Sequence, residues 1–175
     1  MNADTARLFL GLELNDCARN ALADVCAELE HQKLRGKLHA PTLYHLTLCF
    51  LGNTPLHRIS ELQNLMSAIV CTPFSLTLSS LGTFKNGTIL WAGVKECAEL
   101  FEYQSCLAHS LRNAGFPIEE GEYRPHITLG RQVKSEIPPI SVPPVSFNIA
   151  HTTLFESTRI DGVLTYVPIY RSAFH

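Results

Sequence analysis

Two short stretches of the sequence each carry a histidine and a threonine two positions apart, followed directly by a leucine. The first contains His45 and Thr47, and the second contains His126 and Thr128. Residues two apart in an extended strand lie on the same face, so each stretch presents an imidazole beside a hydroxyl. The intervening residues are apolar and are expected to face a core. The sequence therefore predicts two strands with the same polar pair on the same kind of apolar backing.

Such a duplicated pair is suited to general acid–base chemistry. An imidazole titrates near neutral pH, and two of them, one neutral and one protonated, supply a base and an acid together. A nearby hydroxyl can donate a hydrogen bond to an oxygen that gains negative charge. A single histidine on a strand is more often structural, but the second copy with its matching threonine favours function. A third histidine–threonine pair begins at His151, lacks the apolar middle residue and is interpreted as incidental.

The elements that must position these residues follow from the hydrophobic pattern. Strands are expected over residues 7–14, 41–52, 74–84, 88–94, 123–131, 146–157 and 164–174. Helices are expected over residues 16–31 behind an Asn15 cap, from a Thr54 cap with Pro55 at its first position, and over 97–114. The Asn86-Gly87 pair indicates a hairpin, and the proline-rich stretch 136–144 indicates a connector. The mixture predicts an α+β fold with mainly antiparallel pairing.

Composition limits the classes of function. The chain has 175 residues, of which 46% are hydrophobic and 17% charged, and its net charge is −2. This balance argues against a protein that coats long nucleic acid but does not exclude binding to one end of it. The six cysteines show no CxxC spacing, which favours buried, reduced thiols over disulfides or a metal site. No secretory signal or membrane-spanning run is recognised, so a cytoplasmic location without membrane contact is expected.

The stretches "HLTLCFLG" and "RPHITLGR" resemble the paired motifs of the 2H phosphoesterase superfamily. Within it, the chain is most similar to the RNA 2′,3′-cyclic phosphodiesterases of bacteria, formerly called 2′-5′ RNA ligases. The likeness extends to "RLFLGLEL", "TILWAGV" and "LFESTRIDGVLTYVPI". It implies a single bilobal α+β domain over residues 1–175, with two pseudo-symmetric, mainly antiparallel sheets flanked by helices around a central cleft. It also implies that no metal and no other cofactor is needed.

The reaction implied by the resemblance is the hydrolysis of RNA 2′,3′-cyclic phosphate ends to 2′-phosphates. His45 and His126 would be catalytic, with His45 as the acid toward the leaving oxygen and His126 as the base toward water. Spacing alone leaves these two roles open. Thr47 and Thr128 would bind the phosphate, and the reverse reaction would be a minor 2′-5′ ligation. The expected partners are RNA 2′,3′-cyclic phosphate ends or nucleotides, bound by a monomer without an obligate protein partner.

Arg131 and Phe50 are candidate substrate-binding residues that follow the two motifs. Strict alternation places each on the face opposite the histidine of its own motif, so Arg131 would need a strand end or a bulge to reach the site. Phe50 has a competing interpretation as a core residue. Residues 33–39 form a basic loop that contains His39, which fits either an RNA-backbone patch or, more simply, a solvated loop. Arg7 and Tyr166 match family positions whose roles the sequence does not reveal.

Three alternatives remain open at this stage. A metal hydrolase would need clustered histidine and carboxylate ligands, which neither motif strand carries. A noncatalytic module could bind RNA ends in the same cleft without turnover. The same chemistry could also act on another small cyclic phosphate or on a 2′-5′-linked oligonucleotide.

Overall fold

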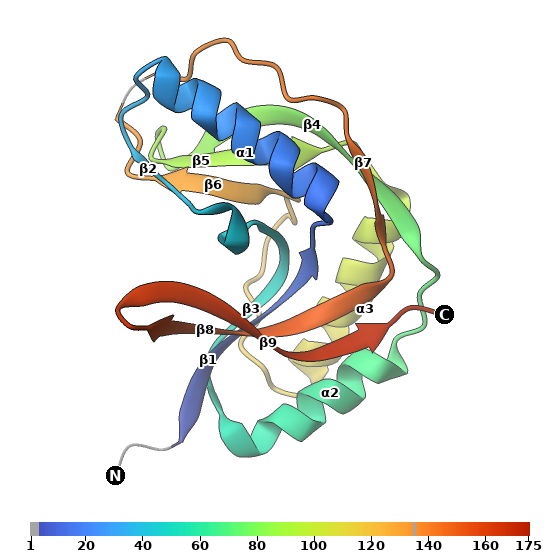
Figure 1. Ribbon diagram of the computed structural model, residues 1–175. Helices are drawn as coiled ribbons and strands as arrows, with labels where there is room; N and C mark the ends of the chain where they lie inside the picture. The colour runs from blue at the N-terminus through green and yellow to red at the C-terminus, as the bar shows by residue number, and fades with distance from the viewer. Residues whose placement is uncertain (1–3, 135) are drawn as a thin grey trace.

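A computed structural model describes residues 4–134 and 136–175, and the strands within them form one nine-stranded antiparallel sheet. The sheet curls around the middle of the molecule (Figure 1). Its strands are β1 (Thr5–Glu13), β2 (Lys37–Leu38), β3 (His45–Pro55), β4 (Phe74–Phe84), β5 (Ile89–Val94), β6 (Ile127–Arg131), β7 (Ser146–Ile149), β8 (His151–Ile160) and β9 (Val163–Ala173). Their order is β7-β4-β5-β6-β3-β1-β8-β9, and β2 pairs with β6. The predicted α+β class with antiparallel pairing is confirmed.

The sheet consists of two similar halves that join between β3 and β6. Each half contains a strand, a helix and a second strand that pairs antiparallel with the first: β1, α1 (Asp16–His31) and β3 in one, and β5, α3 (Ala98–Asn113) and β6 in the other. A further strand extends each half on the side away from the join, β8 beside β1 and β4 beside β5. The two predicted sheets are therefore two halves of one continuous sheet.

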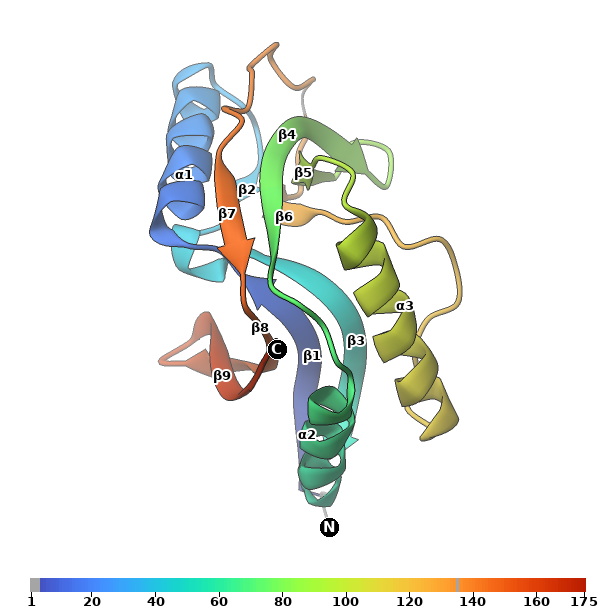
Figure 2. The ribbon, with the colours of Figure 1, turned by 90° about the vertical axis from the view of Figure 1, so that its right-hand side faces the viewer.

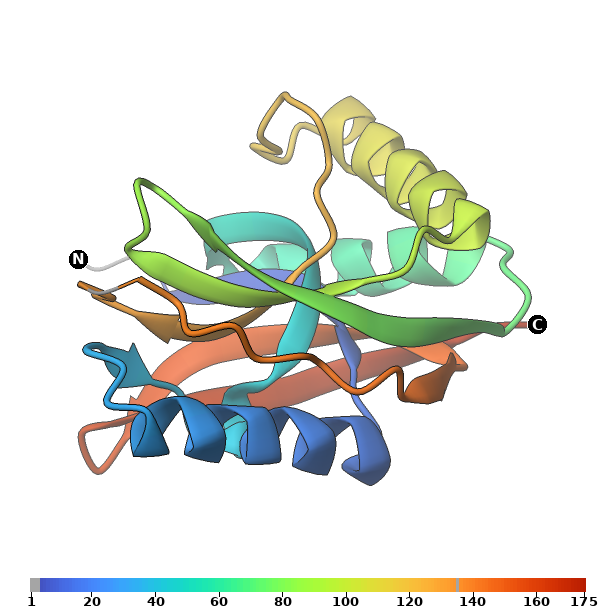
Figure 3. The ribbon, with the colours of Figure 1, turned by 90° about the horizontal axis from the view of Figure 1, so that it is seen from above.

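The helices cover the outer faces of these halves. Helix α1 lies across the half that contains β7, whereas α2 (Ile59–Ala68) and α3 pack together against the half that contains β3 and β9 (Figures 1 and 2). Viewed from above, the sheet separates α1 from α3 (Figure 3). The α1 side chains at helical spacing, Ala18, Leu22, Val25 and Leu29, are buried as the periodicity predicts. Helices α1 and α3 thus each cover the half to which their flanking strands do not belong.

Local signals placed several boundaries correctly. Asn15 caps α1 by accepting a hydrogen bond from the Ala18 N–H at 2.9 Å, as predicted. Asn86 and Gly87 have positive φ angles of 54° and 89° in the hairpin between β4 and β5. Gly115 follows α3 with a φ of 78°, a conformation that glycine adopts without strain. Turn and cap chemistry was therefore a reliable guide to where elements end.

Four boundary predictions were wrong. The strand expected from residue 41 begins at His45, after a 3₁₀ turn, η1 (Pro41–Leu43), and the strand expected from residue 123 begins at Ile127.

The other two wrong boundaries depend on strand pairing. Pro55 does not begin a helix, because the chain stays paired with β1 as far as the Thr5–Pro55 contact, and the Leu56 N–H then donates to the Asp4 carbonyl at 2.9 Å. A short 3₁₀ turn, η2 (Leu56–Arg58), precedes α2. The strand predicted over 146–157 is interrupted at Ala150, because β7 pairs with β4 in one half and β8 pairs with β1 in the other. In both places the partner strand decides the boundary.

None of the helices in the described part of the chain has both the length and the apolar character needed to cross a membrane.

Candidate active site

The two histidine–threonine motifs meet at the join between the halves. Strands β3 and β6 pair antiparallel through Leu46 and Ile127, the middle residues of the two motifs. Continuing this pairing by one residue in each direction sets His45 against Thr128 and Thr47 against His126. Leu46 and Ile127 are fully buried on the opposite side. The structure therefore brings all four predicted residues onto one face of the sheet, here called the motif face.

A bulge after each motif brings Phe50 and Arg131 to the motif face as well. In β3, Gly11 pairs with Thr47 but Leu10 pairs with Cys49, so Leu48 is an extra residue. In β6, Trp91 pairs with Thr128 but Leu90 pairs with Gly130, so one extra residue follows Thr128 there too. Each bulge reverses the alternation beyond it. Phe50 is consequently 52% exposed rather than part of the core, and the bulge that Arg131 requires is present.

His45 is held at both ring nitrogens. Nδ1 lies 2.8 Å from the Leu43 carbonyl oxygen, and Nε2 lies 2.9 Å from the Thr47 hydroxyl oxygen. A carbonyl only accepts hydrogen bonds, so Nδ1 carries the proton and Nε2 of the neutral ring accepts from Thr47. The ring centroids of Phe9 and Tyr166 lie 4.8 and 4.9 Å from that of His45. These contacts fix both the orientation and the tautomer of the ring.

The enclosure of His45 changes its acidity. The pKa of His45 is lowered to about 4, mainly by burial; the hydrogen bond to Leu43 opposes this lowering, and the nearby charges of His126 and His39 add to it. His45 is therefore neutral at pH 7 when no substrate is present. The influence of His126 on this pKa also indicates that the two motif histidines lie close enough to interact.

His126 has a more open setting. Its Nδ1 lies 2.8 Å from the Arg124 carbonyl oxygen, which again leaves Nε2 as the unprotonated nitrogen of the neutral ring. The edge of the ring packs against Phe84, with centroids 4.9 Å apart and planes at 89°. Phe84 comes from the end of β4, beside the hairpin. Sequence reasoning missed Phe84, because its contact with His126 joins segments that are far apart in the chain.

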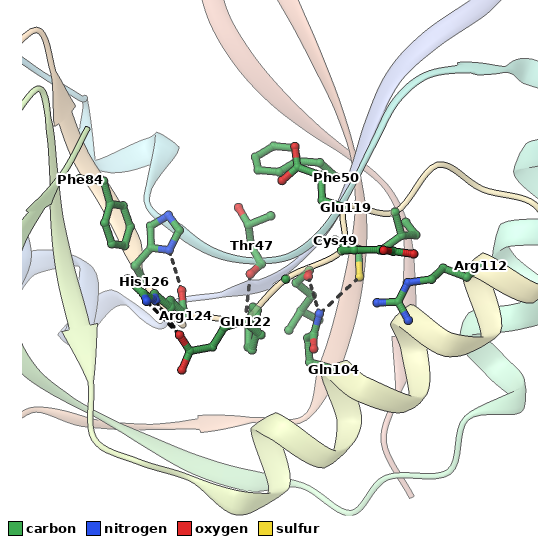
Figure 4. Close-up of a pocket in the computed structure, with 15 residues that line it drawn as sticks. Thr47, Cys49, Phe50, Phe84, Gln104, Arg112, Glu119, Glu122, Arg124 and His126 are labelled. Atoms are coloured by element: carbon green, nitrogen blue, oxygen red, sulfur yellow. Dashed lines mark hydrogen bonds and ion pairs between the residues drawn. The ribbon is translucent and has the colours of Figure 1, made fainter. Parts of the chain in front are cut away.

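A pocket of about 330 Å³ opens beside His126 and extends toward α3 (Figure 4). Thr47, Phe50 and Phe84 line it together with Gln104 and Arg112 of α3. The loop before β6 completes the pocket with three carboxylates: Glu119, Glu120 and Glu122. Figure 4 shows His126 and Phe84 at one side of this space and Phe50 and Arg112 at the other. The pocket is large enough for part of a nucleotide and adjoins the motif residues.

The walls of this pocket also support the motif strand. The Tyr123 hydroxyl donates to the Thr47 carbonyl oxygen at 3.0 Å, and Gln104 Nε2 donates to the Leu48 carbonyl oxygen at 3.2 Å. These bonds satisfy backbone acceptors of β3 where the bulge interrupts its pairing. They therefore stabilise the strand conformation that presents Thr47 and Phe50.

A second, smaller pocket of about 130 Å³ adjoins His45 and is lined by Glu13, Arg19 and Tyr166, among others. Glu13 pairs with His45 across β1 and β3. Its carboxylate accepts hydrogen bonds from Thr153 at 2.6 Å and from Arg171 at 2.7 Å. Burial raises the pKa of Glu13, but the hydrogen bonds from Arg171 and Thr153 and the charge of Arg171 outweigh it and lower the pKa to about 2. Glu13 is a site residue that the sequence analysis missed, although β1 alternation signals it.

The residues that could hold a metal do not gather in the described part of the chain. Across residues 4–134 and 136–175, no three or more histidine, cysteine, aspartate or glutamate side chains are arranged to hold a metal ion.

Comparison with known proteins gives a consistent result. A sequence model of the 2′-5′ RNA ligase superfamily matches residues 18–160. An RNA 2′,3′-cyclic phosphodiesterase of Thermotoga maritima is 26% identical, over 96% of this chain and 95% of that protein. One from Geobacillus stearothermophilus is 39% identical over 54% of this chain, which spans about a third, 32%, of that relative. The crystal structure of Escherichia coli LigT complexed with 3′-AMP has a TM-score of 0.90 and 25% identity, covering 98% of this chain and 99% of that one.

Proposed function

Because this chain belongs to the 2′-5′ RNA ligase superfamily, we propose that it hydrolyses RNA 2′,3′-cyclic phosphate ends to 2′-phosphates. The observation that carries the proposal is the Leu46–Ile127 pairing, which places two histidine–threonine pairs on one face. The names of the relatives in Thermotoga maritima and Geobacillus stearothermophilus support the same activity.

The reaction needs a base, an acid and donors to the phosphoryl oxygens. The base removes a proton from water as its oxygen attacks phosphorus, and the bond from phosphorus to the 3′ oxygen breaks. The acid gives its proton to that leaving oxygen, so the products are a 2′-phosphate and a 3′-hydroxyl. Thr47 and Thr128 donate to the nonbridging oxygens, where negative charge increases. His45 and His126 flank the phosphorus so that the entering and leaving oxygens stand on opposite sides.

We assign the acid to His45 and the base to His126. The Nε2 of neutral His126 is unprotonated, because Nδ1 faces the Arg124 carbonyl. His45 is neutral without substrate and must gain a proton at Nε2 to act as the acid. The negative charge of a bound cyclic phosphate raises the pKa of a neighbouring imidazole. Substrate binding also redirects the Thr47 hydroxyl from Nε2 to a phosphoryl oxygen, which frees Nε2 for the proton.

Phe50 and Arg131 complete the proposed site. The Arg131 guanidinium is suited to a phosphoryl oxygen or to a base edge. Phe50 exposes its ring beside the pocket that adjoins His126 and is suited to stacking on a base. With a 5′-hydroxyl in place of water, the same acid–base pair joins a 2′,3′-cyclic end to that hydroxyl as a minor 2′-5′ ligation, in which the bond from phosphorus to the 3′ oxygen again breaks. The energy for this joining comes from the cyclic ester itself.

The experiment that tests this function is turnover of a nucleoside 2′,3′-cyclic phosphate in excess EDTA, with the 2′- and 3′-phosphate products resolved. Wild type is expected to yield the 2′-phosphate. His45→Ala and His126→Ala are expected to retain the far-ultraviolet circular dichroism of wild type and to lose turnover. Activity that disappears with EDTA would instead indicate a metal hydrolase. Binding of RNA ends without turnover would indicate the noncatalytic module.

The cytoplasmic location, the monomeric state and the single bilobal domain over residues 1–175 stay predictions.

A further inference from the structure

Beside the end of β6, strand β2 carries a cationic side chain, Lys37, that the proposed reaction does not use. Strand β2 pairs with β6 so that Lys37 lies opposite Arg131, and Arg131 lies opposite Ile89 of β5. Directly opposite residues of neighbouring strands project on the same side of a sheet. The bulge in β6 places Arg131 on the motif face, so Lys37 projects from the motif face too. Lys37 and Arg131 form what is here called the cationic row.

His39 connects this row with the catalytic pair. Its backbone N–H donates to the Leu129 carbonyl oxygen at 2.7 Å, which continues the pairing of β2 with β6. Leu38 packs toward the core, so its neighbour His39 faces the motif side like Lys37. Burial lowers the pKa of His39, and the charge of Arg131 lowers it further. His39 in turn influences His45, so a line of polar side chains leads from His45 to the cationic row.

The charge at the other end of β6 has the opposite sign. The loop that precedes β6 contributes Glu119, Glu120 and Glu122 to the pocket beside His126 (Figure 4). Arg124 pairs with Glu122 at 2.9 Å, and Arg112 of α3 lines the same pocket, so two of the three carboxylates are offset and one net negative charge remains. A polyanion whose end is bound at His126 is therefore repelled by this loop and attracted toward the cationic row.

The side chains of the cationic row form no ion pairs within the part of the chain that the structure describes. No ion pair found within residues 4–134 and 136–175 involves Lys37 or Arg131. Lys134 adds positive charge nearby. Its backbone N–H donates to the Arg35 carbonyl oxygen at 2.9 Å, which places Lys134 beside the segment that leads into β2. Lys37 is exposed and stands one strand spacing, about 5 Å, beyond Arg131. An external anion is the natural partner for these charges.

We propose that Lys37, beside Arg131 and His39, binds the phosphodiester one nucleotide upstream of the 2′,3′-cyclic end. The inference rests on the proposed function and narrows its substrate class to oligoribonucleotide ends over free nucleoside cyclic phosphates. It also gives the RNA a direction, with the chain leaving the catalytic pair along β6 toward β2 and away from the acidic loop.

The test compares a nucleoside 2′,3′-cyclic phosphate with a dinucleotide that ends in a 2′,3′-cyclic phosphate. Lys37→Gln is expected to lower kcat/KM for the dinucleotide about tenfold, since it removes one charge-assisted contact, and to leave the nucleoside substrate unchanged. The logarithmic dependence of dinucleotide kcat/KM on salt is expected to become shallower by about 0.7. Lys95→Gln is the matched control, because Lys95 is an exposed lysine just beyond the other end of β5.

A neutral linkage isolates the phosphate itself. For wild type, replacing the internal phosphodiester of the dinucleotide by a methylphosphonate is expected to lower kcat/KM by the same factor as Lys37→Gln does. With this neutral dinucleotide, Lys37→Gln is expected to cause no further decrease in kcat/KM. The subsite would be overturned if Lys37→Gln lowered kcat/KM equally for the nucleoside and the dinucleotide. It would also be overturned if Lys37→Gln lowered kcat/KM further on the methylphosphonate. If wild type turns over neither substrate, the proposed function fails. Fluorescence anisotropy with a labelled dinucleotide 2′-phosphate then decides separately whether Lys37 binds the upstream phosphate, and affinity unaffected by Lys37→Gln overturns it.

Discussion

His45 and His126 each lead into a strand with an apolar residue, a threonine and a bulge, yet their surroundings differ. His45 pairs across the sheet with Glu13 and is enclosed by Phe9 and Tyr166. Continuing the β5–β6 pairing from Ala92 and Ile127 by one residue sets Gly93 against His126. Gly93 offers no side chain to His126, and Ser80 and Trp91 occupy the space beside that glycine, whereas Glu13 places a carboxylate next to His45. The two motif strands therefore have the same backbone arrangement, but the strands paired with them give the two histidines different surroundings.

The residues beyond the bulges differ in the same way. Phe50 and Arg131 occupy equivalent positions, one offering an aromatic ring and the other a guanidinium. A general acid and a general base have different tasks. The terminal nucleotide also has a nucleobase on one side of its cyclic phosphate and the rest of the RNA chain on the other. Two identical halves could hold the phosphate but could not orient it. In the proposed site, the two motifs would therefore hold the phosphate, while the residues around them would set its direction.

The largest expected effect comes from removing either histidine. His45→Ala and His126→Ala should each lower the turnover rate at least about 10²-fold, because each removes a proton-transfer group. Steady-state turnover of a 2′,3′-cyclic phosphate measures this, with circular dichroism as the control for folding. If one variant kept nearly full activity, its histidine would not transfer a proton in the reaction, and the assignment of one catalytic histidine to each half would be wrong.

A substrate with sulfur in place of the 3′ oxygen separates the two roles. A thiolate leaves without protonation, so the general acid becomes dispensable on this substrate. His45→Ala should therefore recover most of its lost activity, within about tenfold of wild type on the same compound. His126→Ala should stay at least about 10²-fold below wild type, since water still needs the base. Recovery by His126→Ala instead of His45→Ala would exchange the two assignments.

How much of this site the sequence predicted depends on the range of the interaction. The repeated motif, the Asn15 cap and the Asn86-Gly87 hairpin are local signals, and each was placed correctly. The bulges after Thr47 and Thr128 are relations between two paired strands, so alternation along one strand could only state that Arg131 needs one. For Phe50, alternation alone left the core interpretation open, and the register shift excludes it.

Long-range partners were outside the reach of local patterns. Glu13 and Arg171 are brought together by β1, β8 and β9, although they stand at opposite ends of the chain. His39 was assigned to a basic loop, and only its pairing with β6 places it on the motif face. Burial of His45 likewise comes from rings on β1 and β9. A family resemblance indicated the candidate residues, whereas the acidity of His45 and the positions of Phe50 and Arg131 depend on the register of the sheet.

The residues after the bulges should affect binding more than chemistry. Arg131→Gln is expected to raise KM about ten- to thirtyfold, because it removes a charge-assisted contact, with a smaller effect on kcat. Phe50→Leu is expected to raise KM by about threefold to tenfold through lost stacking. Measuring kcat and KM on adenosine and uridine 2′,3′-cyclic phosphates checks both. A loss with Phe50→Leu that is mainly in kcat would contradict its assignment to the base.

The enclosure of His45 predicts a difference between two pH profiles. The profile of kcat/KM reflects the free protein, in which the pKa of His45 is about 4, so the protonated acid becomes scarce as pH rises above that value. The profile of kcat reflects the complex, in which the phosphate charge raises this pKa. The optimum of kcat should therefore lie about one pH unit or more above the optimum of kcat/KM. Coincident optima would show that substrate does not protonate His45.

The smallest expected effect concerns stability on the His45 side alone. The pKa of Glu13 in the folded protein is about 2, below its usual value of about 4.3. A carboxyl with a lowered pKa stabilises the fold above its unfolded value, and this contribution is lost as pH falls toward the folded value. Allowing for the partial exposure of Arg171, Glu13→Gln should lower the free energy of unfolding by about 1–2 kcal/mol at pH 7. Urea denaturation at pH 7 and pH 3 should show that difference shrink in acid, while Glu120→Gln in the exposed loop, the matched control, leaves stability unchanged. An equal cost of Glu13→Gln at both pH values would mean that packing, rather than the charge of Glu13, closes the flank of His45.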